Sequence, residues 1–210
     1  MADRPQLLAR SWYSRDALDV APELLNKVLV GTEGRSGRII EVEAYRGPED
    51  PASHAFRGRT ARNATMWGPP GHLYVYFVYG MHWCANVVCA PEGTAQAVLV
   101  RAVQPNGGLA VMRTARWGTR ARPDRDLCRG PARLCQAFDI TGTDDGADLA
   151  ATGGAVVLAD DGTAPPAKPV ISSRIGVSAG AQLPWRFAIA DHPGVSGSGM
   201  APRGNGPGLR

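Results

Sequence analysis

Apolar and polar residues alternate most cleanly over residues 39–45, IIEVEAY. This spacing predicts a strand, because successive side chains of a strand point to opposite faces. Glu41, Glu43 and Tyr45 then share one face, and the apolar residues between them share the other. The pattern therefore indicates a strand that holds a carboxylate beside an aromatic ring, which can place a negative charge next to a stacked planar ligand.

A second stretch, HLYVYFVYGMHWCANVV over residues 72–88, is typical of two strands joined by a tight turn. Tyr74 and Tyr76 project to one side of the first strand, and Tyr79 projects to the other. Gly80 permits the turn, because glycine adopts the backbone conformations that hairpin turns require. An aromatic residue at the tip of a hairpin is suited to insertion between stacked bases.

The remaining pattern predicts a mixture of short helices and strands. Ser14 is a candidate N-cap for the first helix, since its hydroxyl can accept a hydrogen bond from the first turn. Pro131 suits the first turn of a later helix. The predicted helices cover residues 15–25, 107–116 and 131–138, and further strands are expected near residues 27–31, 96–103 and 155–159.

The length and composition favour one soluble domain. A chain of 210 residues can bury one sizeable hydrophobic core. We expect residues 1–13 to be loosely ordered, residues 14–196 to form the domain, and the Gly/Pro/Ser-rich residues 197–210 to be disordered. No run approaches the roughly 18 apolar residues of a membrane helix, and the N-terminus lacks the apolar core of a secretory signal. These features predict a cytoplasmic protein.

Positive charge gathers in one part of the chain. The net charge is +4 and the pI is about 9.1, which favours a polyanionic partner. A solvated arginine-rich surface is the alternative interpretation. The four cysteines lack the paired spacing of a zinc site, so we expect free buried thiols and no metal. The clustered arginines are Arg113, Arg116, Arg120, Arg122, Arg125, Arg129 and Arg133.

Several blocks of this sequence, in one order, resemble the alkyladenine (3-methyladenine, or methylpurine) DNA glycosylase family. The blocks are EVEAYRGPEDPASHAFRG, GHLYVYFVYGMHWCANVV, AVLVRAVQP and LCRGPARLCQAF, with LLNKVLVG before them and RIGVSAG and WRFAIADHPGVS after them. The resemblance spans roughly residues 15–196. It implies a mixed α+β fold: a single domain on a curved, mostly antiparallel sheet with a protruding β-hairpin.

Two residues match the catalytic positions of the family. Glu43 maps onto the catalytic acid, and a carboxylate that faces an anomeric carbon can activate water and stabilise developing positive charge. Arg101 maps onto the arginine that fixes the catalytic water, since a guanidinium can hold water and carboxylate together. Without the resemblance, an exposed strand glutamate and an ion-pairing surface arginine would be the simpler interpretations. Glu41 has no matching role, which favours a structural or solvated one.

Four residues match the base pocket, where aromatic rings stack on a purine and favour electron-poor alkylated bases. Asn86 among them would crowd a purine 2-amino group and so exclude guanine, although a hydrogen-bonded strand asparagine is the alternative. The pocket residues are Tyr45, His54, Tyr76 and Asn86.

Four further residues match DNA-contacting positions. Tyr79 matches the side chain that fills the gap left by a flipped nucleotide, with Met81 as its apolar companion. Gly130 and Arg133 resemble a segment at the DNA backbone, where helix amides and a guanidinium would bind phosphate. An ordinary helix start is the alternative for this last pair.

The resemblance implies a monofunctional glycosylase that acts as a monomer on double-stranded DNA containing damaged purines. Its expected substrates are 3-methyladenine, 7-methylguanine, hypoxanthine and ethenoadenine. No lysine nucleophile stands in a pocket motif, so direct hydrolysis without a Schiff base or cofactor is expected. A non-catalytic module that binds damaged DNA and a hydrolase of free nucleosides are the alternatives.

Overall fold

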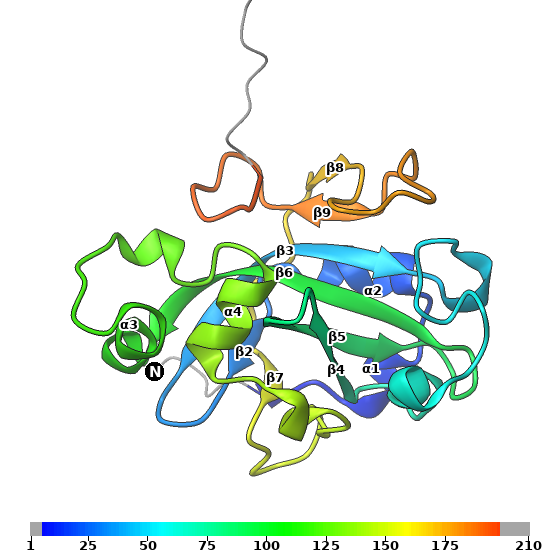
Figure 1. Ribbon diagram of the computed structural model, residues 1–210, viewed down its shortest axis with the longest axis horizontal. Coiled ribbons are helices and arrows are strands. Elements are labelled where there is room, and N and C mark those ends of the chain that lie inside the picture. Colours follow the sequence, from blue (N-terminus) through cyan, green and yellow to red (C-terminus); the bar gives the residue numbers. More distant parts are fainter. Residues whose placement is uncertain (1–5, 198–210) are drawn as a thin grey trace, which may run out of the picture.

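Nine strands form one sheet in the computed structural model, which describes residues 6–197 (Figure 1). The main path runs β1-β7-β2-β3-β6-β5-β4, while β9 pairs with β3 and β8 with β9, and the named pairings are antiparallel. The mixed α+β fold on a mostly antiparallel sheet is therefore confirmed. The strands are β1 (Gln6–Leu7), β2 (Val28–Val30), β3 (Ser36–Tyr45), β4 (Leu73–Val78), β5 (His82–Cys89), β6 (Gln96–Gly107), β7 (Val157–Asp160), β8 (Val170–Ser172) and β9 (Arg186–Ala188).

The two longest strands, β3 and β6, form the middle of the sheet and carry the predicted catalytic pair. Glu43 lies opposite Leu99, so Arg101 falls on the same face two positions later. The register shifts between Glu41 and Val42, where the partner changes from Ala102 to Val100 and leaves Arg101 as an extra residue. Such a bulge re-aims a side chain, and here it lets Arg101 reach both glutamates.

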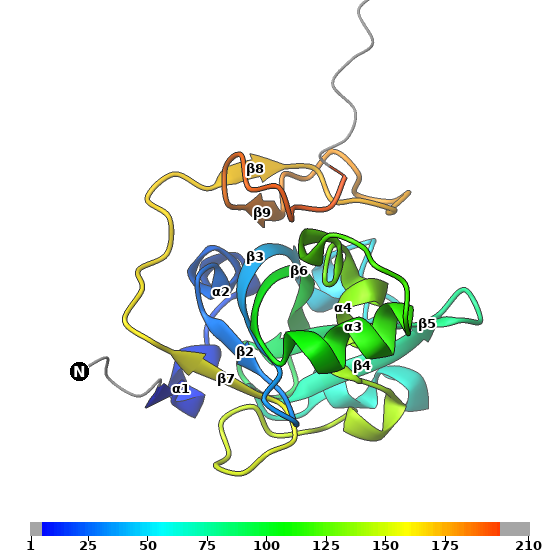
Figure 2. The ribbon, with the colours of Figure 1, turned by 90° about the vertical axis from the view of Figure 1, so that its left-hand side faces the viewer.

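Strands β8 and β9 come from the C-terminal part of the chain and lie over the edge of β3 (Figures 1 and 2). Strand β9 takes the place beside β3 that β2 leaves, pairing Phe187 with Val42 and Arg186 with Glu43. A long connection from β7 brings the chain to this position. Residues far apart in sequence therefore meet beside β3.

Short helices cover the sheet. Helix α2 contacts β3 and β6, α4 contacts β5 and β6, and α3 packs on α4. The N-cap of helix α2 is Asp16, whose carboxylate accepts a hydrogen bond from the Leu18 amide, so the predicted cap Ser14 is wrong. The helices are α1 (Arg10–Tyr13), α2 (Ala17–Leu24), α3 (Leu109–Trp117) and α4 (Pro131–Phe138), with 3₁₀ turns η1 (Gly47–Glu49), η2 (Ala61–Trp67), η3 (Asp124–Asp126) and η4 (Gly142–Asp144).

Residues 6–13 are more ordered than the composition predicts. Residues 6–13 form β1 and α1 instead of a loose segment, and Tyr13 is fully buried in the main core. These residues are ordered by their packing on the core. A segment of so few residues is too short to show a readable hydrophobic periodicity. Of the predicted disordered tail, only Gly197 belongs to the described residues. The extent of the domain, 14–196, stays a prediction.

Strands β4 and β5 form the predicted protruding hairpin, whose tip projects beyond the body of the protein at the right of Figure 2. Tyr79 and Gly80 both adopt positive φ angles, 54° and 66°, as a tight hairpin turn requires. The four cysteines are buried and free. Within residues 6–197, no helix has the length and apolar character needed to cross a membrane.

Candidate active site

A cavity of about 380 Å³ opens between the hairpin, β3 and β6. Its walls come from separate parts of the sequence, which the sheet brings together. Six of the residues predicted from the sequence line it: Tyr45, His54, Tyr76, Tyr79, Asn86 and Arg101. Glu43 does not line the cavity; its side chain is fully buried behind Tyr45 and Arg101.

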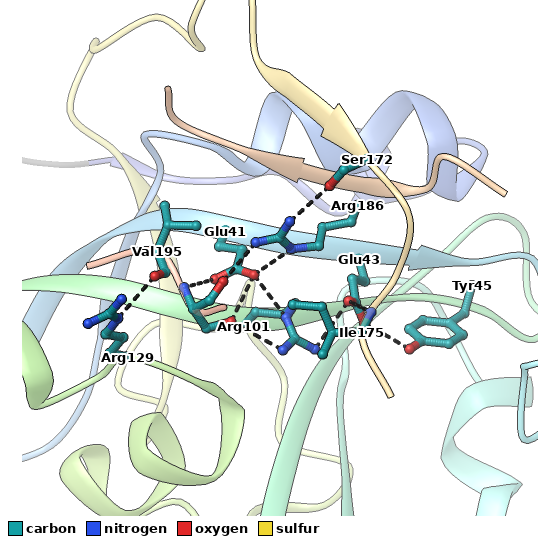
Figure 3. Close-up of polar contacts among 10 residues, drawn as sticks. Glu41, Glu43, Tyr45, Arg101, Arg129, Ser172, Ile175, Arg186 and Val195 are labelled. Carbon is teal, nitrogen blue, oxygen red and sulfur yellow. Dashed lines mark hydrogen bonds and ion pairs between the residues drawn. The ribbon is translucent and has the colours of Figure 1, made fainter. Parts of the chain in front are cut away.

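Three donors converge on the Glu43 carboxylate (Figure 3). The Tyr45 hydroxyl donates to Oε2 at 3.0 Å, the Ile175 amide donates to Oε1 at 2.7 Å, and the Arg101 guanidinium lies 3.1 Å from Oε1. Burial and the adjacent carboxylate raise the pKa of Tyr45, so its hydroxyl stays protonated and available as a donor. The carboxylate is therefore held in one orientation behind the residues that line the cavity.

Arg101 is fixed by a second carboxylate, Glu41, which is also fully buried. Its Nε donates to Glu41 at 3.0 Å, and its Nη2 donates to the Ser196 hydroxyl at 3.1 Å. Glu41 also accepts hydrogen bonds from the Arg186 Nε at 2.7 Å and from the amide and hydroxyl of Ser196 at 2.5 and 2.8 Å (Figure 3). The role of Glu41 is therefore structural, and the solvated alternative is wrong.

The guanidinium of Arg101 keeps its charge inside the protein. Burial opposes that charge, but Glu43 and Glu41 outweigh the effect and raise the pKa of Arg101. Glu41 and Glu43 together balance Arg101 and Arg186. A neutral cluster of this kind can hold buried charges that singly would be costly.

Aromatic rings form one wall of the cavity. The His54 ring lies 4.4 Å from the Tyr76 ring, at an interplanar angle of 80°, and its Nδ1 lies 2.9 Å from the Tyr74 hydroxyl. Burial, helped by the Arg62 guanidinium, lowers the pKa of His54, which favours the neutral ring. The sequence did not assign Tyr74 to the site, but its ring stacks on Tyr76 at 5.6 Å.

Asn86 is buried at the floor of the cavity, with 4% of its surface exposed. Its Nδ2 donates to the Tyr74 carbonyl at 3.1 Å across the β4–β5 ladder. This bond fixes the side-chain amide, and the exclusion of guanine by Asn86 stays a prediction. Asn86 is a hydrogen-bonded strand residue, and it also faces the cavity.

The hairpin tip carries the predicted wedge. Tyr79 is 80% exposed and Met81 67% exposed, the two highest values among the exposed large hydrophobic residues that the structure describes. Phe77, which lies on β4 just before the tip, is less exposed because its ring packs against Trp83 at 4.7 Å. The tip therefore presents two apolar side chains to solvent beside the cavity.

Gly130 and Arg133 lie at the start of α4. Gly130 has a φ angle of 116°, a conformation that favours glycine, and Arg133 is exposed. Part of the arginine cluster is already paired within the protein: Arg113 binds Asp124, and Arg116 binds the Leu127 carbonyl. Only some of the clustered arginines are therefore open to an outside anion.

Comparison with known proteins identifies the family. The family model described as methylpurine-DNA glycosylase matches residues 11–193. The chain belongs to the methylpurine-DNA glycosylase family. Membership makes it an enzyme, a DNA glycosylase of base excision repair that acts on alkylated purines, and the two alternatives are less well supported.

Relatives with 3-methyladenine DNA glycosylase in their names are similar to this methylpurine-DNA glycosylase over most of their length. A protein of Burkholderia lata is 56% identical over 191 residues, covering 91% of both chains. One from Streptomyces avermitilis is 50% identical, covering 90% of both. One from Carboxydothermus hydrogenoformans is 46% identical, covering 90% of this chain and 98% of its own.

Four residues of this glycosylase site were not assigned a role from the sequence. Arg174 and Ile175 belong to the quoted block RIGVSAG, and Arg186 and Ser196 belong to WRFAIADHPGVS. Both blocks are part of the resemblance to the family. Only the fold shows that these two segments lie over Glu41 and Glu43. Residues 6–197 contain no group of three or more His, Cys, Asp or Glu side chains placed to hold a metal ion.

Proposed function

We propose that this glycosylase binds a damaged purine nucleotide, flipped out of duplex DNA, in the cavity and hydrolyses its N-glycosidic bond. The observation that carries the proposal is the Glu43 carboxylate, held by Arg101 and Tyr45, which line an aromatic cavity beside an exposed hairpin tip. The products are a free base and an abasic site. The proposed substrates are 3-methyladenine, 7-methylguanine, hypoxanthine and ethenoadenine.

The chemistry needs a water molecule and stabilisation of positive charge on the sugar. Glu43 serves as the base for that water, and its negative charge stabilises the oxocarbenium-like transition state. Arg101 holds the water, since its guanidinium bridges Glu43 and the cavity. Tyr45, Ile175 and Arg101 all bond to the Glu43 carboxylate, and all three line the cavity from which the water comes.

The cavity selects its base by two different means. Stacking on Tyr45, Tyr76 and His54 favours electron-poor alkylated rings. The fixed amide of Asn86 rejects a 2-amino group by crowding it, which spares guanine and admits hypoxanthine. The neutral His54 ring adds no positive charge against a cationic base.

DNA binding uses the surface around the cavity mouth. Tyr79 and Met81 fill the space left in the base stack, so that the flipped nucleotide does not return. Arg133 and the amides at the start of α4 contact phosphates. We further propose that the protein acts as a monomer in the cytoplasm.

The test is to incubate the protein with duplexes that each carry one lesion and to identify the released bases. Release of free alkylated purine and hypoxanthine is the expected result. Free nucleosides are supplied in parallel: turnover of these without turnover of duplex DNA would instead identify a nucleoside hydrolase. Binding to lesion duplexes without any release would identify a non-catalytic module.

A further inference from the structure

A buried guanidinium lies directly behind the stacking residue Tyr45. Arg174 has a fully buried side chain, and its Cζ lies 4.6 Å from the centre of the Tyr45 ring. The Trp185 ring covers it from another direction at 5.0 Å. Arg174 does not line the cavity, whereas Tyr45 does. The cation is therefore on the interior side of a ring that also faces the cavity.

An aspartate holds Arg174 in this place. Both guanidinium Nη atoms bond to the buried Asp50 carboxylate, at 2.5 and 2.8 Å, and Nη1 also donates to the Ala44 carbonyl at 3.0 Å. Asp50 in turn accepts the amides of Arg46 and Ala52, which fixes the loop that leads to His54. The pair thus joins β3, the His54 loop and the segment that caps Glu43.

The stability of the folded protein does not explain why Arg174 and Asp50 form a buried ion pair. A buried pair gains little net free energy over apolar residues of similar size, because both charges lose their hydration. The Nε of Arg174 is also buried with no hydrogen-bond partner among the described residues, which adds to the cost. A costly arrangement against the wall of a binding cavity points to a role in binding.

The role follows from the electrostatics of an aromatic ring. A cation over one face is attracted by the negative π density of the ring, and it draws on that density. A second cation stacked on the other face of the same ring then gains less stacking free energy. Purines such as 7-methylguanine carry a positive charge, whereas hypoxanthine is neutral, so a cation behind Tyr45 weakens stacking for the first class only.

We propose that Arg174 is a positioning and specificity-determining residue of the base pocket. It fixes the Tyr45 ring and lowers the preference of that ring for cationic over neutral purines, so that one pocket serves both classes. The inference rests on the proposed function, in which Tyr45 stacks on the flipped base.

The experiment compares single-turnover release of 7-methylguanine and hypoxanthine from otherwise identical duplexes. The double variant Asp50→Leu/Arg174→Met removes both charges and keeps similar volumes. We expect the ratio of the 7-methylguanine rate to the hypoxanthine rate to rise about two- to fivefold. A second variant, Asp50→Asn/Arg174→Gln, keeps polar groups at both positions. The same rate ratio is measured with this variant if Asp50→Leu/Arg174→Met does not fold.

Two controls separate this effect from loss of structure. Arg174→Lys keeps the positive charge, so it should keep the wild-type ratio even where both rates fall. Arg38→Met/Asp161→Leu removes a bidentate ion pair between β3 and the loop after β7, away from the pocket, and should leave the ratio unchanged. Circular dichroism is used to check that each variant is folded.

The outcomes are distinct. An unchanged or lowered ratio in a folded neutral double variant overturns the inference, and so does an equal fall of both rates. Failure of the wild-type protein to release either base overturns the proposed function instead. A raised ratio in the Arg38→Met/Asp161→Leu control also overturns the inference, because the change would then follow from destabilisation.

Discussion

Two glutamates on one face of β3 have different surroundings. Glu41 receives hydrogen bonds from Arg101, Arg186 and Ser196, and these surround both of its oxygens. Glu43 is held by one guanidinium, one hydroxyl and one amide, next to the cavity. The first carboxylate is suited to positioning Arg101, and the second is suited to acting on a water.

Glu41→Gln tests the positioning role. The change removes one of the two carboxylates that balance Arg101 and Arg186, so Arg101 loses its fixed orientation. We expect the single-turnover rate to fall on the order of 10- to 100-fold while lesion binding changes little. The free energy of unfolding should fall by about 3 kcal/mol, because a buried charge cluster is left unbalanced.

Ser196→Ala is the matched control for Glu41→Gln, since it removes a neutral partner of the same carboxylate. Its effect on rate and stability should be smaller, with a loss of about 1 kcal/mol in the free energy of unfolding. A wild-type rate for Glu41→Gln would show that Arg101 does not depend on this carboxylate.

Asn86→Ser tests the filter against guanine. The shorter side chain no longer crowds a 2-amino group, so release of undamaged guanine should rise relative to hypoxanthine, about tenfold to a hundredfold. The measurement is the ratio of the two single-turnover rates, with guanine placed in a mismatch where flipping is easier. An unchanged ratio in a folded variant would leave Asn86 with its bond to Tyr74 as its only role.

Resemblance predicted the residues of the cavity better than those behind it. Tyr45, Asn86 and Arg101 stand in blocks with a readable pattern, and the fold brings them together. Arg174 and Ser196 act on β3 from more than a hundred residues away in the chain. Sequence alone does not show which distant segment closes over a strand, so their contacts could not be predicted.

At the scale of elements, the hairpin β4–β5 was predictable and the strand pair β8–β9 was not. The hairpin shows alternating aromatic residues around Gly80, a direct signal of two strands and a turn. Strands β8 and β9 have three residues each, too few for any alternation to stand out. Strand β9 forms along the free edge of β3, and β8 pairs with β9.

A substitution at the hairpin tip is expected to lower activity without lowering the stability of the fold. Tyr79 has a φ angle of 54°, which glycine adopts without strain. Tyr79→Gly should therefore keep the free energy of unfolding within about 1 kcal/mol of wild type. Excision of well-paired lesions should nevertheless fall most, because the wedge is missing, and poorly paired lesions should suffer less.

Ile171→Ala is a suitable control for Tyr79→Gly, because Ile171 is also a large exposed apolar residue, on β8 away from the hairpin. It should leave both classes of lesion unaffected. Equal losses on well-paired and poorly paired lesions in Tyr79→Gly would contradict the wedge role. The measurement is single-turnover excision of the same lesion opposite a matched and a mismatched base.

At the scale of the whole molecule, the net charge of +4 predicts binding to duplex DNA that weakens steeply with salt. Arg133→Ala should reduce the slope of log affinity against log salt by about one, since one phosphate contact is lost. Arg113→Ala is the control, because Asp124 already pairs with this arginine, and its slope should change less. Binding that does not respond to salt would contradict the proposed DNA surface.

Whether Glu43 performs the hydrolysis is tested by Glu43→Gln. The variant keeps the shape of the side chain but removes the base and its negative charge. Single-turnover excision and equilibrium binding are measured on one duplex that carries a lesion the wild-type protein releases. Excision should be abolished while binding stays close to that of wild type. Excision by Glu43→Gln at near the wild-type rate would contradict the proposed role of Glu43.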